Sequence, residues 1–238
     1  MKNAIIIGAS SGIGKELALI LVENGYQVAI TGRRSDELEK IKSTKSSQFI
    51  IKQHDITNQA QTTQVFSELI QEMGTVDLII HSSGIGDPNY QLDFEVDLPT
   101  IRTNVLGATQ LYGLAYNLFK KQGFGHLVGI TSVASIRGNR HVPAYFASKA
   151  YQASYLESLW FKAQKSKLPI FITDIQPGFV DTPMALGKTF WMATSQKAAK
   201  QIFTAIVAKK KKAYITKRWA LVAFVMKLTP SKLYAKLF

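Results

Sequence analysis

A glycine-rich turn between an expected strand and an expected helix constrains the fold most. The run GASSGIG, from Gly8 to Gly14, follows a short apolar run, Ala4 to Ile7, and precedes apolar residues at helical spacing, from Leu17 to Val22. Glycine lets a backbone approach a bound pyrophosphate, and a helix N-terminus offers free N–H groups and the positive end of its dipole. The turn is therefore a predicted phosphate-binding site. The alternative is a glycine-rich turn without a ligand.

Apolar runs and helical patterns alternate along the rest of the chain. We expect strands at 26–31, 49–52, 77–80, 125–131, 169–175 and 213–216, helices at 58–73, 100–121, 144–165 and 195–208, and loops at 85–99 and 179–194. This alternation predicts a parallel sheet covered on both faces and joined by right-handed crossovers. The 238 residues suffice for one large domain. We therefore predict a Rossmann-like, doubly wound α/β fold of about seven strands over residues 1–216, followed by a helical extension, 217–238.

The residues after the second expected strand distinguish between nicotinamide cofactors. In a dinucleotide site, an acid there bonds the ribose 2′-hydroxyl of NAD, whereas an arginine accommodates the 2′-phosphate of NADP. This chain has Gly32 followed by Arg33 and Arg34, which predicts NADP(H) binding. The alternative is a loop with two solvated arginines. Asp36 and Glu37 are expected to open the next helix.

A second group of candidate residues lies between Ser132 and Lys149. Tyr145 and Lys149 are four residues apart, which puts both on one face of the expected helix 144–165. An ammonium beside a phenol favours the phenolate, so we expect Lys149 to lower the pKa of Tyr145 from about 10 and make it a general acid or base. Ser132 follows an apolar run, and we expect its hydroxyl at the carboxyl end of a buried strand. Taken alone, a tyrosine and a lysine at this spacing are usually a packed aromatic residue and a solvated amine.

Other strand ends carry further candidates. Asp55, after the third expected strand, could contact an adenine ring or cap helix 58–73. The sequence HSSG, from His81 to Gly84, ends the fourth strand, and its glycine lets backbone lie along a cofactor. Asn104 lies inside an expected helix, which it can bend by bonding backbone or water. We interpret His54 and His81 as structural residues.

These motifs together resemble the short-chain dehydrogenase/reductase family over residues 3–216. GASSGIG matches its glycine motif, and TGRR, from Thr31 to Arg34, resembles the NADP(H)-preferring members. NVLG, ITSVAS and YFASK match the segments with its catalytic residues, and QPGFVDTP, from Gln176 to Pro183, matches its segment near the nicotinamide. HSSG stands where the family commonly has an Asn-Asn-Ala-Gly type of sequence.

The resemblance implies hydride transfer between nicotinamide C4 and a carbonyl or alcohol carbon. Tyr145 would exchange the proton on oxygen, and Ser132 would stabilise the developing charge. Lys149 would lower the pKa of Tyr145 and bind the nicotinamide ribose, and Asn104 would hold a water that links Lys149 to solvent. The implied cofactor-binding residues are Gly8, Ser10, Ser11, Gly12, Ile13, Gly14, Arg33, Arg34, Asp55, Ile56, Ser83, Gly84, Asn104, Tyr145, Lys149, Pro177, Gly178, Val180 and Thr182. Helices 100–121 and 144–165 pair subunits in much of the family, so we expect a homodimer or homotetramer by analogy.

Composition and motifs disfavour several other classes. No apolar run reaches the roughly 18 residues of a membrane-spanning helix, and the apolar run in MKNAIIIG is too short for a signal peptide. The chain has no cysteine, hence no thiolate metal site, which fits a cytoplasmic protein. A nucleic-acid binder is disfavoured because the lysine run 209–212 lies near one end without a reader motif. A non-enzymatic NADP(H) sensor on the same fold is the alternative function, against which the complete set of catalytic residues argues.

The net charge of +13 is concentrated in the last quarter of the chain. Residues 182–238 hold twelve lysines and arginines and no aspartate or glutamate. Within them, Trp219 to Met226 is apolar on every face, and Pro230 ends the helix. The segment 217–238 either lies at an anionic membrane surface or buries its apolar side against the body or a second subunit. The apolar loop 179–194, which includes Leu186, is either a lid over an apolar substrate or ordinary packing.

Overall fold

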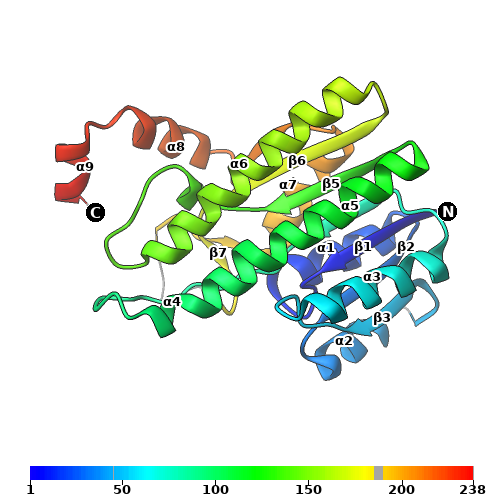
Figure 1. Cartoon of the computed structure of the whole chain (residues 1–238). Coiled ribbons are helices and arrows are strands. Elements are labelled where there is room, and N and C mark those ends of the chain that lie inside the picture. The colour runs from blue at the N-terminus through cyan, green and yellow to red at the C-terminus, as the bar shows by residue number, and fades with distance from the viewer. Residues whose placement is uncertain (45, 185–189, 238) are drawn as a thin grey trace.

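The structure, a computed structural model, describes residues 1–44, 46–184 and 190–237 around a central parallel sheet (Figure 1). Seven strands of this part of the chain follow in the order β3-β2-β1-β4-β5-β6-β9, each parallel to its neighbours. They are β1 (Lys2–Ile7), β2 (Tyr26–Gly32), β3 (Phe49–Gln53), β4 (Leu78–His81), β5 (Gly125–Ile130), β6 (Ile170–Pro177) and β9 (Lys212–Ile215). Each strand overlaps a predicted one, so the predicted doubly wound α/β fold is confirmed.

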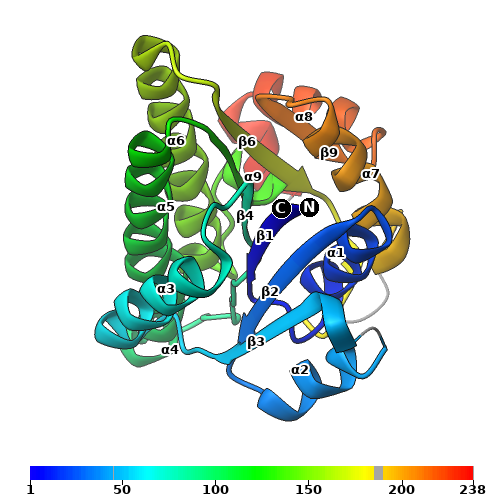
Figure 2. The same cartoon turned by 90° about the vertical axis from the view of Figure 1, so that its right-hand side faces the viewer.

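Helices cover both faces of the sheet (Figure 2). The helices of these two layers are α1 (Gly12–Glu23), α2 (Ser35–Lys42), α3 (Gln59–Met73), α5 (Ala108–Gln122), α6 (Pro143–Ser166) and α7 (Ser195–Val207). Ala4 and Ile6 of β1 belong to a buried cluster with α1, α2 and α7, against which Ile13 is half-buried. Ile5 and Ile7 belong to a second cluster with α3, α5 and α6. Burial on both faces explains why β1 is a continuous apolar run instead of an alternating one.

The helix α4 (Phe94–Ile101) begins inside the segment predicted as a loop, 85–99. Asp93 caps this helix, because its carboxylate accepts a hydrogen bond from Glu95 N at 2.9 Å. Pro99 lies within α4, and the prediction of a loop up to Pro99 was wrong. The cap at Asp93 outweighs the breaking tendency of the proline.

A π-helical turn (Arg102–Gly107) separates α4 from α5, where the sequence predicted one continuous helix over 100–121. The turn carries Asn104 and ends at Gly107, where a Cβ would come within 2.7 Å of the Ile56 carbonyl oxygen. Such turns are frequent at functional sites. The spacing of apolar residues detects the helices on either side of the turn but not the interruption.

The segment predicted as a loop over 179–194 contains a small parallel pair of strands. β7 (Val180–Asp181) pairs with β8 (Ala193–Thr194), and Val180 is buried in it. Thr194 then caps α7 by accepting a hydrogen bond from Lys197 N at 3.2 Å. This pairing holds the two ends of the segment together. The predicted lid residue Leu186 lies outside the described residues.

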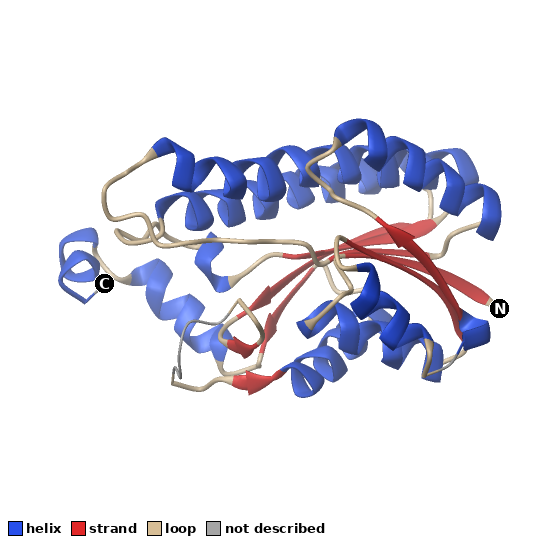
Figure 3. Ribbon diagram, turned by 90° about the horizontal axis from the view of Figure 1, so that it is seen from below, coloured by secondary structure: helices blue, strands red, loops and turns tan. Residues whose placement is uncertain are grey.

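Two further helices lie at the C-terminal end of the chain, at the carboxyl edge of the sheet (Figure 3). They are α8 (Trp219–Leu228) and α9 (Ser231–Leu237), separated at Pro230 as predicted. Short 3₁₀ helices occur at Ser46–Gln48 and Val133–Ser135. None of the helices in the described part of the chain is long and apolar enough to cross a membrane.

Candidate active site

The predicted site residues gather at the carboxyl edge of the sheet. The strands β1, β4, β5 and β6 end at Ile7, His81, Ile130 and Pro177, and each leads directly into a segment with candidate residues. In open parallel sheets this edge is where ligands bind. The geometry of each segment decides what could bind there.

The glycine turn after β1 has little room for side chains at its three glycine positions. Gly8 and Gly12 have φ angles of 90° and 55°, which glycine adopts without strain. A Cβ on Gly14 would lie 2.2 Å from the Gly8 carbonyl oxygen, and one on Gly8 would lie 2.6 Å from Ser83 N. Within the described chain no side chain caps α1, whose N-cap residue is Ser11. The first N–H groups of α1 therefore remain available to an anion.

Arg34 reaches this turn from the end of β2. One Nη of Arg34 donates hydrogen bonds to Ser10 Oγ at 2.9 Å and to Ser11 Oγ at 2.8 Å. Gly32 assists the close approach, since a Cβ there would lie 3.3 Å from the Cβ of Ser10. The Arg34 guanidinium is exposed beside the glycine turn, and an exposed guanidinium can form charge-assisted hydrogen bonds with an anion.

Arg33 lies instead beside the end of β3, near Asp55. Burial pulls the pKa of Asp55 upward, but hydrogen bonds from Thr57 and the charge of Arg33 hold it below its ordinary value. Those hydrogen bonds come from Thr57 N at 2.9 Å and Thr57 Oγ1 at 2.8 Å. The cap of α3 is Asn58, which accepts from Gln61 N at 3.0 Å. Of the two roles considered for Asp55, the helix cap is thus wrong, and contact with an adenine ring stays a prediction.

Asn104, in the π-helical turn, forms hydrogen bonds with the segment after β4. Its Oδ1 accepts a hydrogen bond from Ile85 N at 3.0 Å, and its Nδ2 donates to Ile85 O at 2.7 Å and Ser148 Oγ at 2.9 Å. A Cβ on Gly84 would lie 3.1 Å from Nζ of Lys149. Gly84 therefore lets the backbone pass directly beside the ammonium group.

Lys149 is buried and joined to Asn104 through a residue that the sequence did not single out. Its Nζ donates to Ile130 O at 3.1 Å and to Gln152 Oε1 at 3.0 Å, and Gln152 Nε2 donates to Asn104 O at 2.8 Å. The Gln152 amide thus connects Lys149 with the backbone of Asn104; a water held by Asn104 that links Lys149 to solvent stays a prediction. Burial lowers the pKa of Lys149 to about 8, against the opposing effect of the Asp174 charge.

Tyr145 lies with Ser132 and Lys149, but its pKa moves opposite to the expected direction. Lys149 Nζ is 5.7 Å from the centroid of the Tyr145 ring, as their spacing predicted. Burial raises the pKa of Tyr145, and its hydrogen bond with Ser132 partly opposes this rise. The net direction is therefore opposite to the lowering expected from Lys149, because desolvation of the phenolate dominates.

The segment after β6 brings Pro177, Gly178 and Thr182 to the same region. Ser132 Oγ donates a long hydrogen bond of 3.4 Å to Pro177 O. The Cγ2 of Thr182 is 3.0 Å from where a Cβ on Gly12 would lie, so the chain returns to the glycine turn. Both ends of the candidate cofactor site thus border one continuous surface.

Trp219 of α8 packs against the segment that follows β6. A Cβ on Gly178 would lie 2.0 Å from the Trp219 ring. Phe179 and Phe190 stack against the indole at 5.3 Å and 5.5 Å between ring centroids. Glycine at 178 is therefore required for α8 to dock, and the C-terminal helix contributes directly to the site wall.

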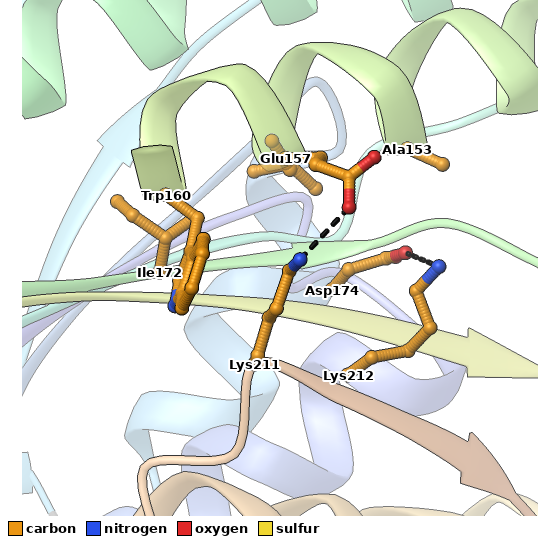
Figure 4. A pocket seen from close by; sticks show the side chains of 8 residues that line it. Ala153, Glu157, Trp160, Ile172, Asp174, Lys211 and Lys212 are labelled. Carbon is orange, nitrogen blue, oxygen red and sulfur yellow. Dashed lines mark hydrogen bonds and ion pairs between the residues drawn. The ribbon is translucent and has the colours of Figure 1, made fainter. Parts of the chain in front are cut away.

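A small pocket between α6, β6 and β9 lies apart from these residues (Figure 4). Two ion pairs cross it, Lys211 to Glu157 at 2.8 Å and Lys212 to Asp174 at 3.7 Å. Burial raises the pKa of Asp174, and a hydrogen bond from Thr131 opposes this effect. We assign no ligand to this pocket, because its own charged side chains satisfy one another.

Comparison with known proteins identifies the family. A family model described as short chain dehydrogenase matches residues 2–193. The chain belongs to the short-chain dehydrogenase family. An uncharacterized oxidoreductase of Mycobacterium tuberculosis is 31% identical over 215 residues, covering 86% of this chain and 84% of the relative. One from Myxococcus xanthus is 31% identical over 196 residues, covering 80% of this chain and 77% of the relative.

Solved structures of short-chain dehydrogenases share the fold. The enzyme from Burkholderia phymatum, in complex with NAD, has a TM-score of 0.86 at 18% identity and covers 94% of this chain and 92% of its own. ElxO with NADP bound has a TM-score of 0.76 at 22% identity and covers 85% of this chain and 90% of its own. The family model and the oxidoreductases that the chain resembles show that it is an oxidoreductase of the short-chain dehydrogenase family. Among the structures that share its fold, one holds NAD and another NADP.

Several residues of this short-chain dehydrogenase site were missed from the sequence. Gly86 adjoins Tyr145, since a Cβ there would lie 2.4 Å from the Tyr145 ring. Gln152 and Trp219 contact predicted site residues because the fold brings separate segments of the chain together. Gln152 had a detectable signal, because a glutamine three residues after Lys149 lies on the same helical face. His81 is fully buried and bonds Tyr112 OH at 2.9 Å, which agrees with its interpretation as structural.

Proposed function

We propose that this short-chain dehydrogenase uses NADP(H) to interconvert an apolar carbonyl compound and its alcohol. The observation that carries the proposal is the convergence of the Tyr145 phenol, the Ser132 hydroxyl and the Lys149 ammonium beside the glycine turn. A phenol and a hydroxyl that share a hydrogen bond can together bind one substrate oxygen. The substrate oxygen would therefore lie between Tyr145 and Ser132.

The residues around the glycine turn fit NADP(H). The close contacts that a Cβ would make at Gly8 and Gly14, and the uncapped start of α1, support pyrophosphate binding at the glycine turn. Arg34, held at Ser10 and Ser11, offers a charge-assisted partner to a ribose 2′-phosphate. The segments at Ser83–Gly84 and Pro177–Thr182 would border the nicotinamide half. When bound, the nicotinamide supplies or accepts the hydride.

Tyr145 would act as the proton donor in the direction of reduction. Because burial raises its pKa, the phenol stays protonated near neutral pH, which is the form that reduction needs. Ser132 would bond the same substrate oxygen and stabilise its developing negative charge. Lys149 would hold the nicotinamide ribose hydroxyls, and its contacts with Gln152 would keep its ammonium in place.

An apolar substrate is supported by the side chains beyond β6. Phe179, Phe190 and Trp191 are 41%, 60% and 46% exposed, although they belong to one aromatic cluster with the buried Trp219. Exposed aromatic rings beside a polar catalytic group are typical of a pocket for an apolar ligand. A substrate that covers these rings would remove their apolar surface from water.

The experiment is NADPH oxidation, followed by absorbance, with a panel of apolar aldehydes and ketones. Tyr145→Phe is expected to lower turnover on the order of 10³-fold, because the proton donor is lost, while the NADPH dissociation constant stays nearly unchanged. Tyr151→Phe is the matched control, since Tyr151 lies on the same helix and bonds Thr109 Oγ1 at 2.6 Å. It should keep full activity.

The alternatives give different results in the same experiment. Full turnover by Tyr145→Phe would remove Tyr145 from the reaction. A wild-type protein that binds NADPH tightly but reduces no carbonyl compound would favour the non-enzymatic sensor. Failure to bind either NADPH or NADH would remove the basis of both proposals.

A further inference from the structure

The helix α8 has apolar residues on two opposite faces. Trp219, Ala223 and Met226 are buried against the body of the protein. Leu221, Phe224, Val225 and Leu228 form a second stripe at helical spacing, and they are 64%, 59%, 53% and 66% exposed. In α9, Leu233 is 50% exposed. We call these five residues the exposed apolar stripe. A surface helix normally presents polar residues at such positions, so this stripe requires a partner.

The charges on and directly before α8 and α9 have one sign, although Glu157 of α6 is close enough to Lys227 for their charges to interact. Lys217 and Arg218 precede α8, Lys227 lies in its last turn, and Lys232 and Lys236 lie in α9; all five are exposed. The whole region 182–238 contains no acidic residue. An apolar stripe flanked by basic side chains matches the boundary between anionic lipid headgroups and acyl chains.

The stripe is held in a fixed place relative to the candidate active site. Arg137, in the loop after Ser132, donates hydrogen bonds to Met226 O at 3.2 Å and Ser231 Oγ at 2.9 Å, and its guanidinium lies 4.5 Å from the Tyr234 ring centroid. At the other end of α8, Trp219 packs on Gly178. Both anchors come from segments with predicted site residues, so the buried face of α8 contacts these segments while the stripe on its opposite face is exposed.

We propose that α8 and α9 dock this protein on an anionic lipid bilayer as a peripheral contact. Association of the stripe with the same face of a second copy would place lysines against lysines, which is unfavourable. A bilayer that contains phosphatidylserine offers both an apolar phase for Phe224 and Leu228 and negative charge for the lysines. This inference does not depend on the proposed enzymatic function.

The test is flotation of the full-length protein with vesicles of phosphatidylcholine, with and without phosphatidylserine. We expect binding only to the phosphatidylserine vesicles, and weaker binding at high salt. Leu221→Ser/Phe224→Ser should lower the vesicle partition coefficient about tenfold or more, because two anchoring side chains are lost. Lys232→Gln/Lys236→Gln should lower it by about fivefold per charge and should reduce the preference for phosphatidylserine, which Lys217, Arg218 and Lys227 still support.

Matched controls lie on α7, on another part of the same basic region. Lys197→Gln/Lys200→Gln removes two exposed lysines, and Val207→Ser changes a residue that is 63% exposed; both should bind vesicles like the wild type. Light scattering of each variant reports its oligomeric state, and melting temperature reports folding. No flotation of the full-length chain would overturn the proposal. So would unchanged binding by the apolar variant, or conversion by that variant of a dimer into a monomer, which would assign the stripe to a second subunit.

Discussion

The two arginines after β2 have different surroundings, and this difference predicts different effects on cofactor affinity. Arg34 bonds Ser10 and Ser11 at the glycine turn, whereas Arg33 lies near Asp55. Arg34→Ala should weaken NADPH binding by roughly 10- to 100-fold, the worth of charge-assisted hydrogen bonds to a phosphate. NADH binding should change less than about threefold, because NADH has no 2′-phosphate.

Fluorescence titration with NADPH and NADH checks this, with Arg33→Ala as the matched control. Arg33→Ala should have the smaller effect on NADPH. Equal losses of NADPH and NADH affinity in Arg34→Ala would show that Arg34 supports the turn without contacting the 2′-phosphate. Tighter binding of NADH than NADPH by the wild type would overturn the cofactor preference.

Gln152 predicts a shift in the pH dependence of turnover. Its Oε1 accepts a hydrogen bond from the Lys149 ammonium at 3.0 Å, and burial already lowers the pKa of Lys149 to about 8. Gln152→Met removes the acceptor and should move the alkaline limb of the kcat profile to lower pH. Gln152→Glu adds a negative charge beside the ammonium and should move this limb to higher pH.

The opposite directions distinguish positioning of Lys149 from a general loss of packing. A role limited to filling the core would lower kcat in both variants without moving the limb in opposite senses. Melting temperatures of both proteins provide the folding control. If the kcat profiles of both variants keep the alkaline limb of the wild type, the hydrogen bond between Lys149 and Gln152 has no part in turnover.

Elements were predicted well where a local pattern determines them. The seven strands of the sheet and the helices that cover it follow from apolar runs and helical spacing, which reflect burial on each face. The sequence indicated that Asn104 could bend its helix by bonding backbone, but not that the interruption is a π-helical turn, because the partners of Asn104, Ile85 and Ser148, are distant in sequence. The pair β7 and β8 has two residues in each strand, too few for a periodic signal.

Sequence motifs predicted which residues gather in the candidate site, but not the direction in which the pKa of Tyr145 is shifted. Motif spacing located Ser132, Tyr145 and Lys149 at one sheet edge. The direction of the Tyr145 pKa was not predictable, because it depends on burial and on where the Lys149 ammonium points. Gln152 could have been found from its spacing of three residues from Lys149 on one helical face, whereas its second partner, the Asn104 carbonyl, is distant in sequence.

The charge distribution of the whole molecule separates a nearly neutral body from a basic C-terminal quarter. Residues 1–181 carry seventeen lysines and arginines against sixteen acids, whereas 182–238 carry twelve and none. Such an asymmetric molecule orients in the field of an anionic surface before it makes contact. The same end of the molecule carries the exposed apolar stripe. In the proposed docking, electrostatic orientation of the protein would therefore bring the stripe to the bilayer that buries it.

Buried histidines predict acid sensitivity of the folded molecule. Burial lowers the pKa of His81 from 6.5 to about 3, with the Lys149 charge acting in the same direction, and it lowers the pKa of His126 to about 4, assisted by Lys209. In the unfolded chain both would titrate near 6.5. The unfolded state therefore binds more protons below pH 6.5, so their contribution to stability is complete above that pH and falls as the pH is lowered toward 4.

Each histidine should cost about 1.4 kcal/mol of unfolding free energy per pH unit below 6.5. Chemical denaturation between neutral and mildly acidic pH measures this slope, and His81→Gln/His126→Gln should show a shallower one than the wild type. His141→Gln is the control, because His141 is only partly buried. An unchanged slope in the double variant would assign the acid sensitivity to other groups, among them the carboxylates held below their ordinary pKa by lysine partners, such as Glu157 beside Lys211.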